Sequence, residues 1–210
     1  MNYKQRRLMP QQSHTSITLA TKVTLFRILG IPVFILLMIY YKMSLAEGDP
    51  NEYQRMLALT LFIVIALTDA LDGYLARTRN EITRLGAILD PLADKALLLS
   101  AIILLTRPSL PELQPQFPVI ITMIVISRDA VLLAGTFIIH WLSGSIEVNP
   151  RISGKLATVF QMSAVIWALA AWPGAPFLVL AWLAALLTML SGVQYVYDGK
   201  RYLEKHAAHT

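Results

Sequence analysis

Six long apolar runs constrain the fold of this chain more than any other feature. A helix needs about 20 mostly apolar residues to cross the hydrocarbon core of a bilayer. The six runs occupy residues 24–43, 54–76, 86–106, 117–142, 152–172 and 176–197. Helices that satisfy their own backbone hydrogen bonds are one of only two solutions inside a bilayer. The pattern therefore predicts an all-α membrane protein with six transmembrane helices.

Composition and charge agree with this interpretation. The chain is 56% hydrophobic and only 15% charged, whereas charged residues make up about a quarter of a soluble domain. A formal net charge of +5 would suggest nucleic acid as the partner of a soluble protein. In a membrane protein, positive-inside flanks and anionic headgroups explain the charge better. We expect a lipid bilayer as partner and no nucleic acid. The absence of cysteine excludes disulfides and cysteine-ligated metals.

The distribution of Lys and Arg predicts the topology. Twelve of these residues lie in the N-terminal segment, the second and fourth connections and the C-terminal tail, against three in the other connections. The positive-inside rule then places both termini in the cytoplasm, with the second connection. We divide the chain into a cytoplasmic N-terminal segment (1–23), one six-span domain (24–197) and a cytoplasmic tail (198–210). An amphipathic surface helix is expected to begin within residues 17–26, and no cleavable signal peptide is expected.

Two further features of the runs predict packing. Arg27, near the start of the first run, is expected to extend its charged end to the membrane interface. Small residues in the last two runs permit close helix approach and are candidates for a dimer contact. They are Ala164, Ala168, Ala171, Ala181, Ala184 and Ala185.

Four aspartates lie at the ends of the second and third runs. Asp69 and Asp72 are three residues apart, and Asp90 and Asp94 are four apart, so each pair shares one face of a helix. Ionisable residues at membrane depth mark functional sites. Four converging carboxylates repel one another unless cations lie between them, and oxygen ligands favour Mg²⁺ or Mn²⁺ over zinc. The sequence predicts a metal site near the cytoplasmic ends of two antiparallel helices.

Two glycines lie in phase with these aspartates. Gly73 and Gly86 remove side chains from the same helix faces, which lets a ligand approach the backbone. Arg77, one turn beyond Gly73, can bind a phosphate as a bidentate donor. The constellation indicates a metal-dependent enzyme that acts on a phosphate compound at a membrane surface.

The same residues form a recognisable signature. The chain resembles the CDP-alcohol phosphotransferase family, whose motif is D-x2-D-G-x2-A-R-x8-G-x3-D-x3-D. The eight fixed positions are Asp69, Asp72, Gly73, Ala76, Arg77, Gly86, Asp90 and Asp94. The resemblance extends over most of the chain. It implies transfer of a phosphatidyl group from CDP-diacylglycerol to an alcohol, release of CMP, two Mg²⁺ or Mn²⁺ ions and a homodimer.

The resemblance also implies residue roles. Asp69, Asp72 and Asp90 would be the principal metal ligands. Asp94 would complete the second metal site and is the candidate general base, so Asp90 and Asp94 are the catalytic candidates. Gly73, Ala76 and Gly86 would line the nucleotide pocket, and Arg77 would hold the diphosphate.

The alcohol acceptor is identified less directly. Arg128 lies inside the fourth run and Lys155 at the entrance of the fifth. A buried Arg needs an anionic partner, which is either a protein carboxylate or a substrate phosphate. Adjacent helix positions face apart, so we expect Arg128 and Asp129 to be poor partners for each other. A pair between Lys95 and an aspartate is the structural alternative to a phosphate site.

Two acceptors carry a phosphate. Glycerol 3-phosphate would give phosphatidylglycerophosphate, and the stretch Leu-Asp-Pro-Leu-Ala-Asp-Lys at 89–95 resembles that branch of the family. Phosphatidylglycerol would be the acceptor of a CMP-forming cardiolipin synthase, which Ser127-Arg128-Asp129 resembles more. We favour glycerol 3-phosphate and keep phosphatidylglycerol as the alternative.

Other classes of protein fit less well. A small cation transporter would place its carboxylates near the midplane and line a path to both membrane faces, whereas the charges here gather on one side. Intramembrane prenyltransferases use Asp-rich motifs of different spacing. We expect an integral protein of the bacterial inner membrane with its active site on the cytoplasmic side.

Overall fold

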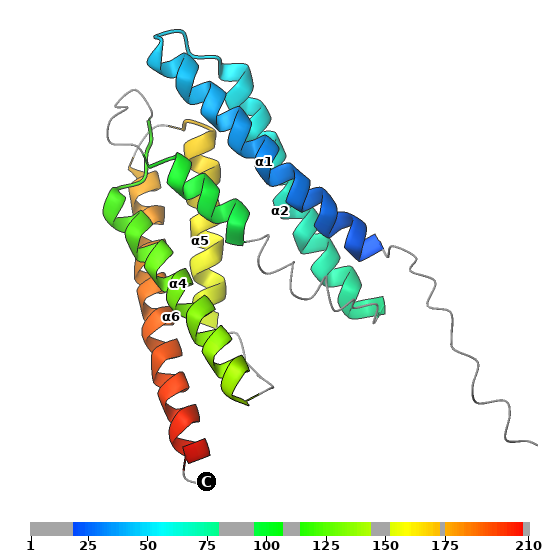
Figure 1. The fold of residues 1–210 in the computed structure, drawn as a ribbon. Coiled ribbons are helices and arrows are strands. Elements are labelled where there is room, and N and C mark those ends of the chain that lie inside the picture. The colour runs from blue at the N-terminus through cyan, green and yellow to red at the C-terminus, as the bar shows by residue number, and fades with distance from the viewer. Residues whose placement is uncertain (1–18, 80–94, 107–113, 144–151, 173–174, 208–210) are drawn as a thin grey trace, which may run out of the picture.

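All elements in the described part of the chain are α-helices in the computed structural model, which describes residues 19–79, 95–106, 114–143, 152–172 and 175–207 (Figure 1). Toward some helix ends only the backbone is described. The long helices are α1 (Leu19–Ala46), α2 (Glu52–Arg79), α4 (Val119–Ser143), α5 (Ile152–Leu169) and α6 (Pro176–Ala207). A short helix, Lys95–Leu104, precedes α4.

Three helices have the length and composition of membrane spans. Among the described residues these spans are Phe26–Ala46, Ile152–Leu169 and Pro176–Asp198. They match the first, fifth and sixth predicted runs, and α2 and α4 cover most of the second and fourth. An all-helical membrane protein is therefore confirmed, while the complete set of six spans stays a prediction.

The helices alternate in direction. α1 packs along α2, and α5 packs along α6, which also contacts α4. α2 touches α5, which joins the first pair of helices to the others. In Figure 1, α1 and α5 begin at the lower end of the molecule, where α2, α4 and α6 end.

Apolar side chains cover the outside of α1 as well as its inside. Leu29, Val33 and Leu36 are exposed, whereas Phe34 and Met38 are fully buried. Exposed apolar stripes of this kind on a helix mark a surface that meets lipid or another protein. A lipid-facing outer surface explains why the helix is apolar on both faces.

Aromatic pairs fix the contacts between helices. Phe34 of α1 and Phe62 of α2 are both fully buried, with ring centroids 5.8 Å apart. Phe117 and Phe177 meet edge to face at 5.1 Å, before α4 and at the start of α6. Such pairs add about 0.5–1.5 kcal/mol beyond their area burial.

The small residues of the last two helices pack inside the chain. Ala164 and Ala168 of α5 are buried, as are Ala181, Ala184 and Ala185 of α6, and the two helices are in contact. Close helix approach was thus a correct prediction for these five positions. Their use as a dimer contact was wrong, because a residue buried between helices of one chain cannot reach a second copy.

Two cations of α1 are buried. Arg27 is 2% exposed, so the expectation that it reaches the interface was wrong, because it lies on the face of α1 that packs inward. Lys42 is 7% exposed and donates a hydrogen bond to the backbone carbonyl of Leu104. That carbonyl lies at the C-terminal end of the short helix, where a cation is favourable.

Replacement of Phe62 by Ala should destabilise the α1–α2 pair. The change removes a fully buried ring and leaves a cavity beside Phe34, which costs about 3 kcal/mol. Thermal unfolding in detergent measures the effect, with Met56→Ala as the control because Met56 lies on the same helix and is 49% exposed. Equal melting temperatures for the two variants would contradict the described packing.

Candidate active site

The first half of the aspartate motif lies on an unbroken helix. α2 continues to Arg79, so the backbone of Asp69, Asp72 and Gly73 has the predicted helical spacing, one turn apart on a common face. Ala76 and Arg77 follow on the next turn. The structure describes the backbone of these five residues, and the direction of their side chains stays a prediction.

The second half of the motif lies outside the described residues. This applies to Gly86, Asp90 and Asp94. The helix that follows begins at Lys95, directly after Asp94 in the chain. The convergence of the four carboxylates, and with it the metal site, therefore stays a prediction.

A cluster of charged side chains joins the short helix to α4. The Oδ1 atom of Asp129 lies 2.6 Å from Nη1 of Arg128 and 3.2 Å from Nζ of Lys95. The side chains of Arg128 and Asp129 are only 13% and 11% exposed, and that of Lys95 is 32% exposed. Lys95, Arg128 and Asp129 form a trio of two cations and one anion, which carries one net positive charge among mostly apolar helices.

The pairing of Arg128 with Asp129 corrects a prediction. Adjacent positions on a helix were expected to face apart. The long side chain of Arg128 bends toward its neighbour, because a guanidinium among apolar helices gains more from a carboxylate than it loses in rotamer freedom. The alternative pair of Lys95 with an aspartate is confirmed at the same time, since both cations share Asp129.

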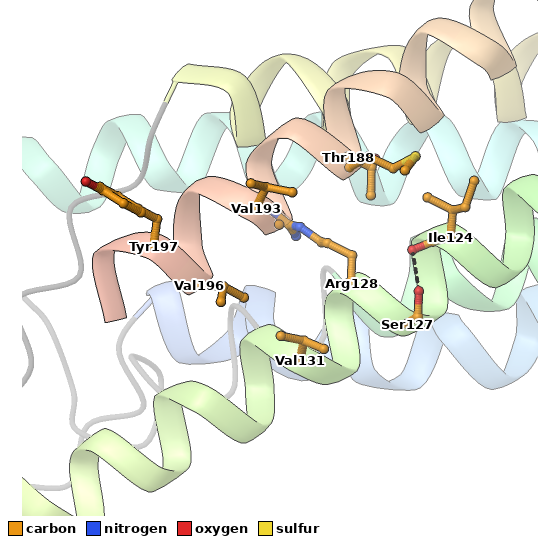
Figure 2. Close-up of a pocket in the computed structure, with 10 residues that line it drawn as sticks. Ile124, Ser127, Arg128, Val131, Thr188, Val193, Val196 and Tyr197 are labelled. Carbon is orange, nitrogen blue, oxygen red and sulfur yellow. Dashed lines mark hydrogen bonds between the residues drawn. The ribbon is translucent and has the colours of Figure 1, made fainter. Parts of the chain in front are cut away.

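Helices α5 and α6 complete the surroundings of Arg128. Its Nη2 donates a hydrogen bond to Oγ of Ser191 at 2.9 Å. A Cβ atom added to Gly154 would lie 3.2 Å from Nη2 and 3.1 Å from that Oγ, and one added to Gly192 would lie 3.4 Å from Cγ of Arg128. Glycine at 154 thus makes room for a guanidinium that extends from α4 toward α6 (Figure 2).

Further polar contacts lie along the α5–α6 interface. Ser153 Oγ donates to Oε1 of Gln194 at 2.7 Å, and Gln161 Nε2 donates to Oγ1 of Thr188 at 2.9 Å. Hydrogen bonds between apolar helices in a membrane stabilise their association by about 1 kcal/mol each. These bonds hold α6 in register with α5 on both sides of Ser191.

A groove of about 560 Å³ runs between α4 and α6 beside Arg128. Apart from Arg128 its walls are mainly apolar, as Figure 2 shows for Val131, Val193 and Val196. Val193 and Val196 are more than half exposed. The groove therefore brings an apolar surface next to a buried cation.

Lys155 has no described contact with this cluster. It is exposed on the first turn of α5, directly after Gly154. The structure thus brings Lys95 close to Arg128 through Asp129, whereas a role of Lys155 beside Arg128 stays a prediction.

Sequence reasoning missed Ser191 and the role of Gly154. A signal existed, because Thr188 and Ser191 are polar residues three apart in an apolar run and so share a helix face. The partner of that face was not available from the sequence, since Arg128 lies 63 residues away.

Comparison with known proteins defines the class. Residues 17–191 match the sequence model of the CDP-alcohol phosphatidyltransferases. The matched segment contains the whole aspartate motif together with Arg128, Asp129 and Gly154. The chain belongs to the CDP-alcohol phosphatidyltransferase family, as the motif predicted.

Individual relatives are similar over almost their full length. A protein of Escherichia coli K12 is 33% identical over 185 residues, which cover 84% of this chain and 91% of the relative. A protein of Salmonella paratyphi A is 32% identical with the same coverage. Both carry the name CDP-diacylglycerol--glycerol-3-phosphate 3-phosphatidyltransferase.

Gly154→Ala should disturb the seat of Arg128. The added methyl group forces Ser191 or Arg128 to shift by a few tenths of an ångström, and such overpacking costs about 1 kcal/mol. Thermal unfolding of Gly154→Ala, Ser191→Ala and the double variant tests the contact. The double variant should lose less stability than the two single variants together. If the losses of stability in the two single variants simply add up in the double variant, residues 154 and 191 are not in contact.

Proposed function

We propose that this protein transfers a phosphatidyl group from CDP-diacylglycerol to glycerol 3-phosphate, which releases CMP and forms phosphatidylglycerophosphate for phospholipid biosynthesis. The observation that carries the proposal is the similarity to bacterial enzymes named for this reaction over 84% of the chain. The complete eight-residue motif lies inside the family match. The described membrane spans agree with a substrate that resides in the bilayer.

The donor set of the motif suits divalent ions. Asp69 and Asp72 lie one turn apart on a continuous helix, and their carboxylates, with those of Asp90 and Asp94, are the oxygen ligands that Mg²⁺ or Mn²⁺ prefers. In our proposal these four residues hold two ions. When bound, the ions would neutralise the diphosphate and stabilise the leaving phosphate.

The other motif residues bind and orient the substrates. Gly73, Ala76 and Gly86 line the nucleotide pocket, and Arg77 binds the diphosphate of CDP-diacylglycerol. Asp94 accepts the proton of the acceptor hydroxyl. The hydroxyl oxygen forms a bond to the phosphorus that carries diacylglycerol, and the bond from that phosphorus to CMP breaks. Asp90 and Asp94 are thus the proposed catalytic pair.

Arg128 and Lys155 are assigned to the acceptor. A fixed guanidinium is a good partner for a phosphate, because its donors match two phosphate oxygens. The contacts with Asp129 and Ser191 hold Arg128 in place and leave the trio positively charged. Lys155, exposed at the start of α5, adds a long-range attraction for an anionic acceptor.

A second candidate is a CMP-forming cardiolipin synthase with phosphatidylglycerol as the acceptor. The groove between α4 and α6 supports it, because an apolar surface beside Arg128 would suit an acceptor with both a phosphate and acyl chains. Glycerol 3-phosphate is preferred because the relatives named above carry it in their names.

CMP release from CDP-diacylglycerol tests the function. Purified protein with Mg²⁺ or Mn²⁺ should release CMP with glycerol 3-phosphate and far less with phosphatidylglycerol. The reverse preference would identify the cardiolipin reaction. CMP release with neither acceptor would refute both candidates.

Aspartate variants test whether the motif carboxylates are needed for CMP release. Asp69→Asn and Asp90→Asn keep the size of the side chain and remove its charge, so turnover should fall at least about a thousandfold if the carboxylates hold the metals. Unfolding temperatures close to that of the wild type show that the variants fold. Retained turnover in both variants would refute the proposed two-ion site.

We also propose that the protein lies in the bacterial inner membrane as a homodimer, with both termini and the active site on the cytoplasmic side. The common end of the helices in Figure 1 supports this orientation, together with the excess of Lys and Arg in the flanking segments. The dimer rests on the family resemblance alone.

Cysteine labelling tests the orientation. The chain has no native cysteine, so Asn2→Cys, Thr210→Cys and Asp49→Cys each give one label site. An impermeant thiol reagent applied to intact cells should label only residue 49, which lies in the connection between α1 and α2. Labelling of residue 2 or 210 from outside would contradict the proposed topology.

A further inference from the structure

One carboxylate oxygen of the candidate site is shared by two cations from different helices. Oδ1 of Asp129 receives hydrogen bonds from Nζ of Lys95, at the first residue of the short helix, and from Nη1 of Arg128 on α4. Both nitrogens therefore border a single point in space. In an apolar setting two such cations would separate without the anion between them.

The accessibility of the three side chains is unequal. Lys95 is 32% exposed, whereas Asp129 is 11% exposed. Lys95 is therefore the most accessible member of the trio, while the carboxylate that anchors it is largely covered. The ammonium group has three donors, of which the bond to Asp129 occupies one.

Arg128 is held from two directions. Asp129 binds Nη1 and Ser191 binds Nη2, and Gly154 lies close against the guanidinium. A guanidinium fixed at both ends is preorganised, so that binding an anion costs little further side-chain entropy. Asp129 supplies the only charged anchor among the described contacts of this group.

We propose that Asp129 is a positioning residue that holds Lys95 and Arg128 together as one binding site for the phosphate of the acceptor. The inference rests on the proposed function and adds Lys95 and Asp129 to the acceptor side. Asp129 thereby joins Arg128 on α4 to Lys95, the first residue of the short helix.

Asp129→Asn is the direct test. The amide keeps the size of the side chain but removes its charge, so the two cations lose their common anchor. The KM for glycerol 3-phosphate should rise about tenfold, as expected for weakened charge-assisted contacts, while the KM for CDP-diacylglycerol stays within about twofold. Asp129→Glu retains the charge and should restore part of the loss.

Thr60→Ala is the control. Thr60 lies on α2, is exposed and bonds only to a carbonyl of its own helix among the described contacts. Both KM values should be unchanged in this variant. An unchanged KM for glycerol 3-phosphate in Asp129→Asn, or an equal rise for both substrates, would overturn the positioning role. If Asp129→Asn does not fold, Lys95→Gln tests the same site from the other side of the contact. An unchanged KM for glycerol 3-phosphate in a folded Lys95→Gln variant would overturn the shared site.

A binding measurement separates this inference from the proposed reaction. Glycerol 3-phosphate, and inorganic phosphate as a simpler probe, should raise the melting temperature of the wild-type protein and raise it much less in Asp129→Asn. If the melting temperature rises more in the wild type than in Asp129→Asn but the wild type releases no CMP, the proposed reaction is wrong and the anion site is supported. Equal shifts in both proteins refute the anion site even if CMP is released.

Discussion

A charge buried among apolar helices is stable only beside an opposite charge or a strong hydrogen-bond partner, and the Asp129 carboxylate meets this condition for two cations at once. Without it Lys95 and Arg128 would repel each other where the short helix meets α4. Ser191 and the small volume of Gly154 then let α5 and α6 close around the guanidinium. One ionic contact therefore stabilises the place where the short helix, α4, α5 and α6 come together around Arg128.

The two parts of the candidate site lie on different groups of helices. The first aspartates lie on α2, which pairs with α1 through apolar and aromatic contacts. The cationic cluster lies between α4, α5 and α6, where polar contacts supplement close packing of alanines. In the chain, the short helix lies between α2 and α4, and the aspartate motif ends directly before it. Its first residue, Lys95, takes part in the cationic cluster.

Much of the architecture follows from the sequence, because apolar run length and charge position act locally. Family membership was available from the aspartate motif, whose spacing agrees with the continuous helix α2. The contacts of Arg128 were not predictable, since Ser191 and Lys95 come from distant parts of the chain. Arg27 was misjudged because membrane depth alone does not reveal which face of a helix packs inward. The alanines of α5 and α6 were named as candidates for a dimer contact for the same reason.

The helix Lys95–Leu104 is fastened by a lysine at each end. Lys95 itself binds Asp129 at one end, and Lys42 of α1 binds the carbonyl of Leu104 at the other. A rod held at both ends cannot slide along its axis or rotate freely. One contact goes to α1 and the other to α4, so these two helices together fix the position of the short helix along its own axis.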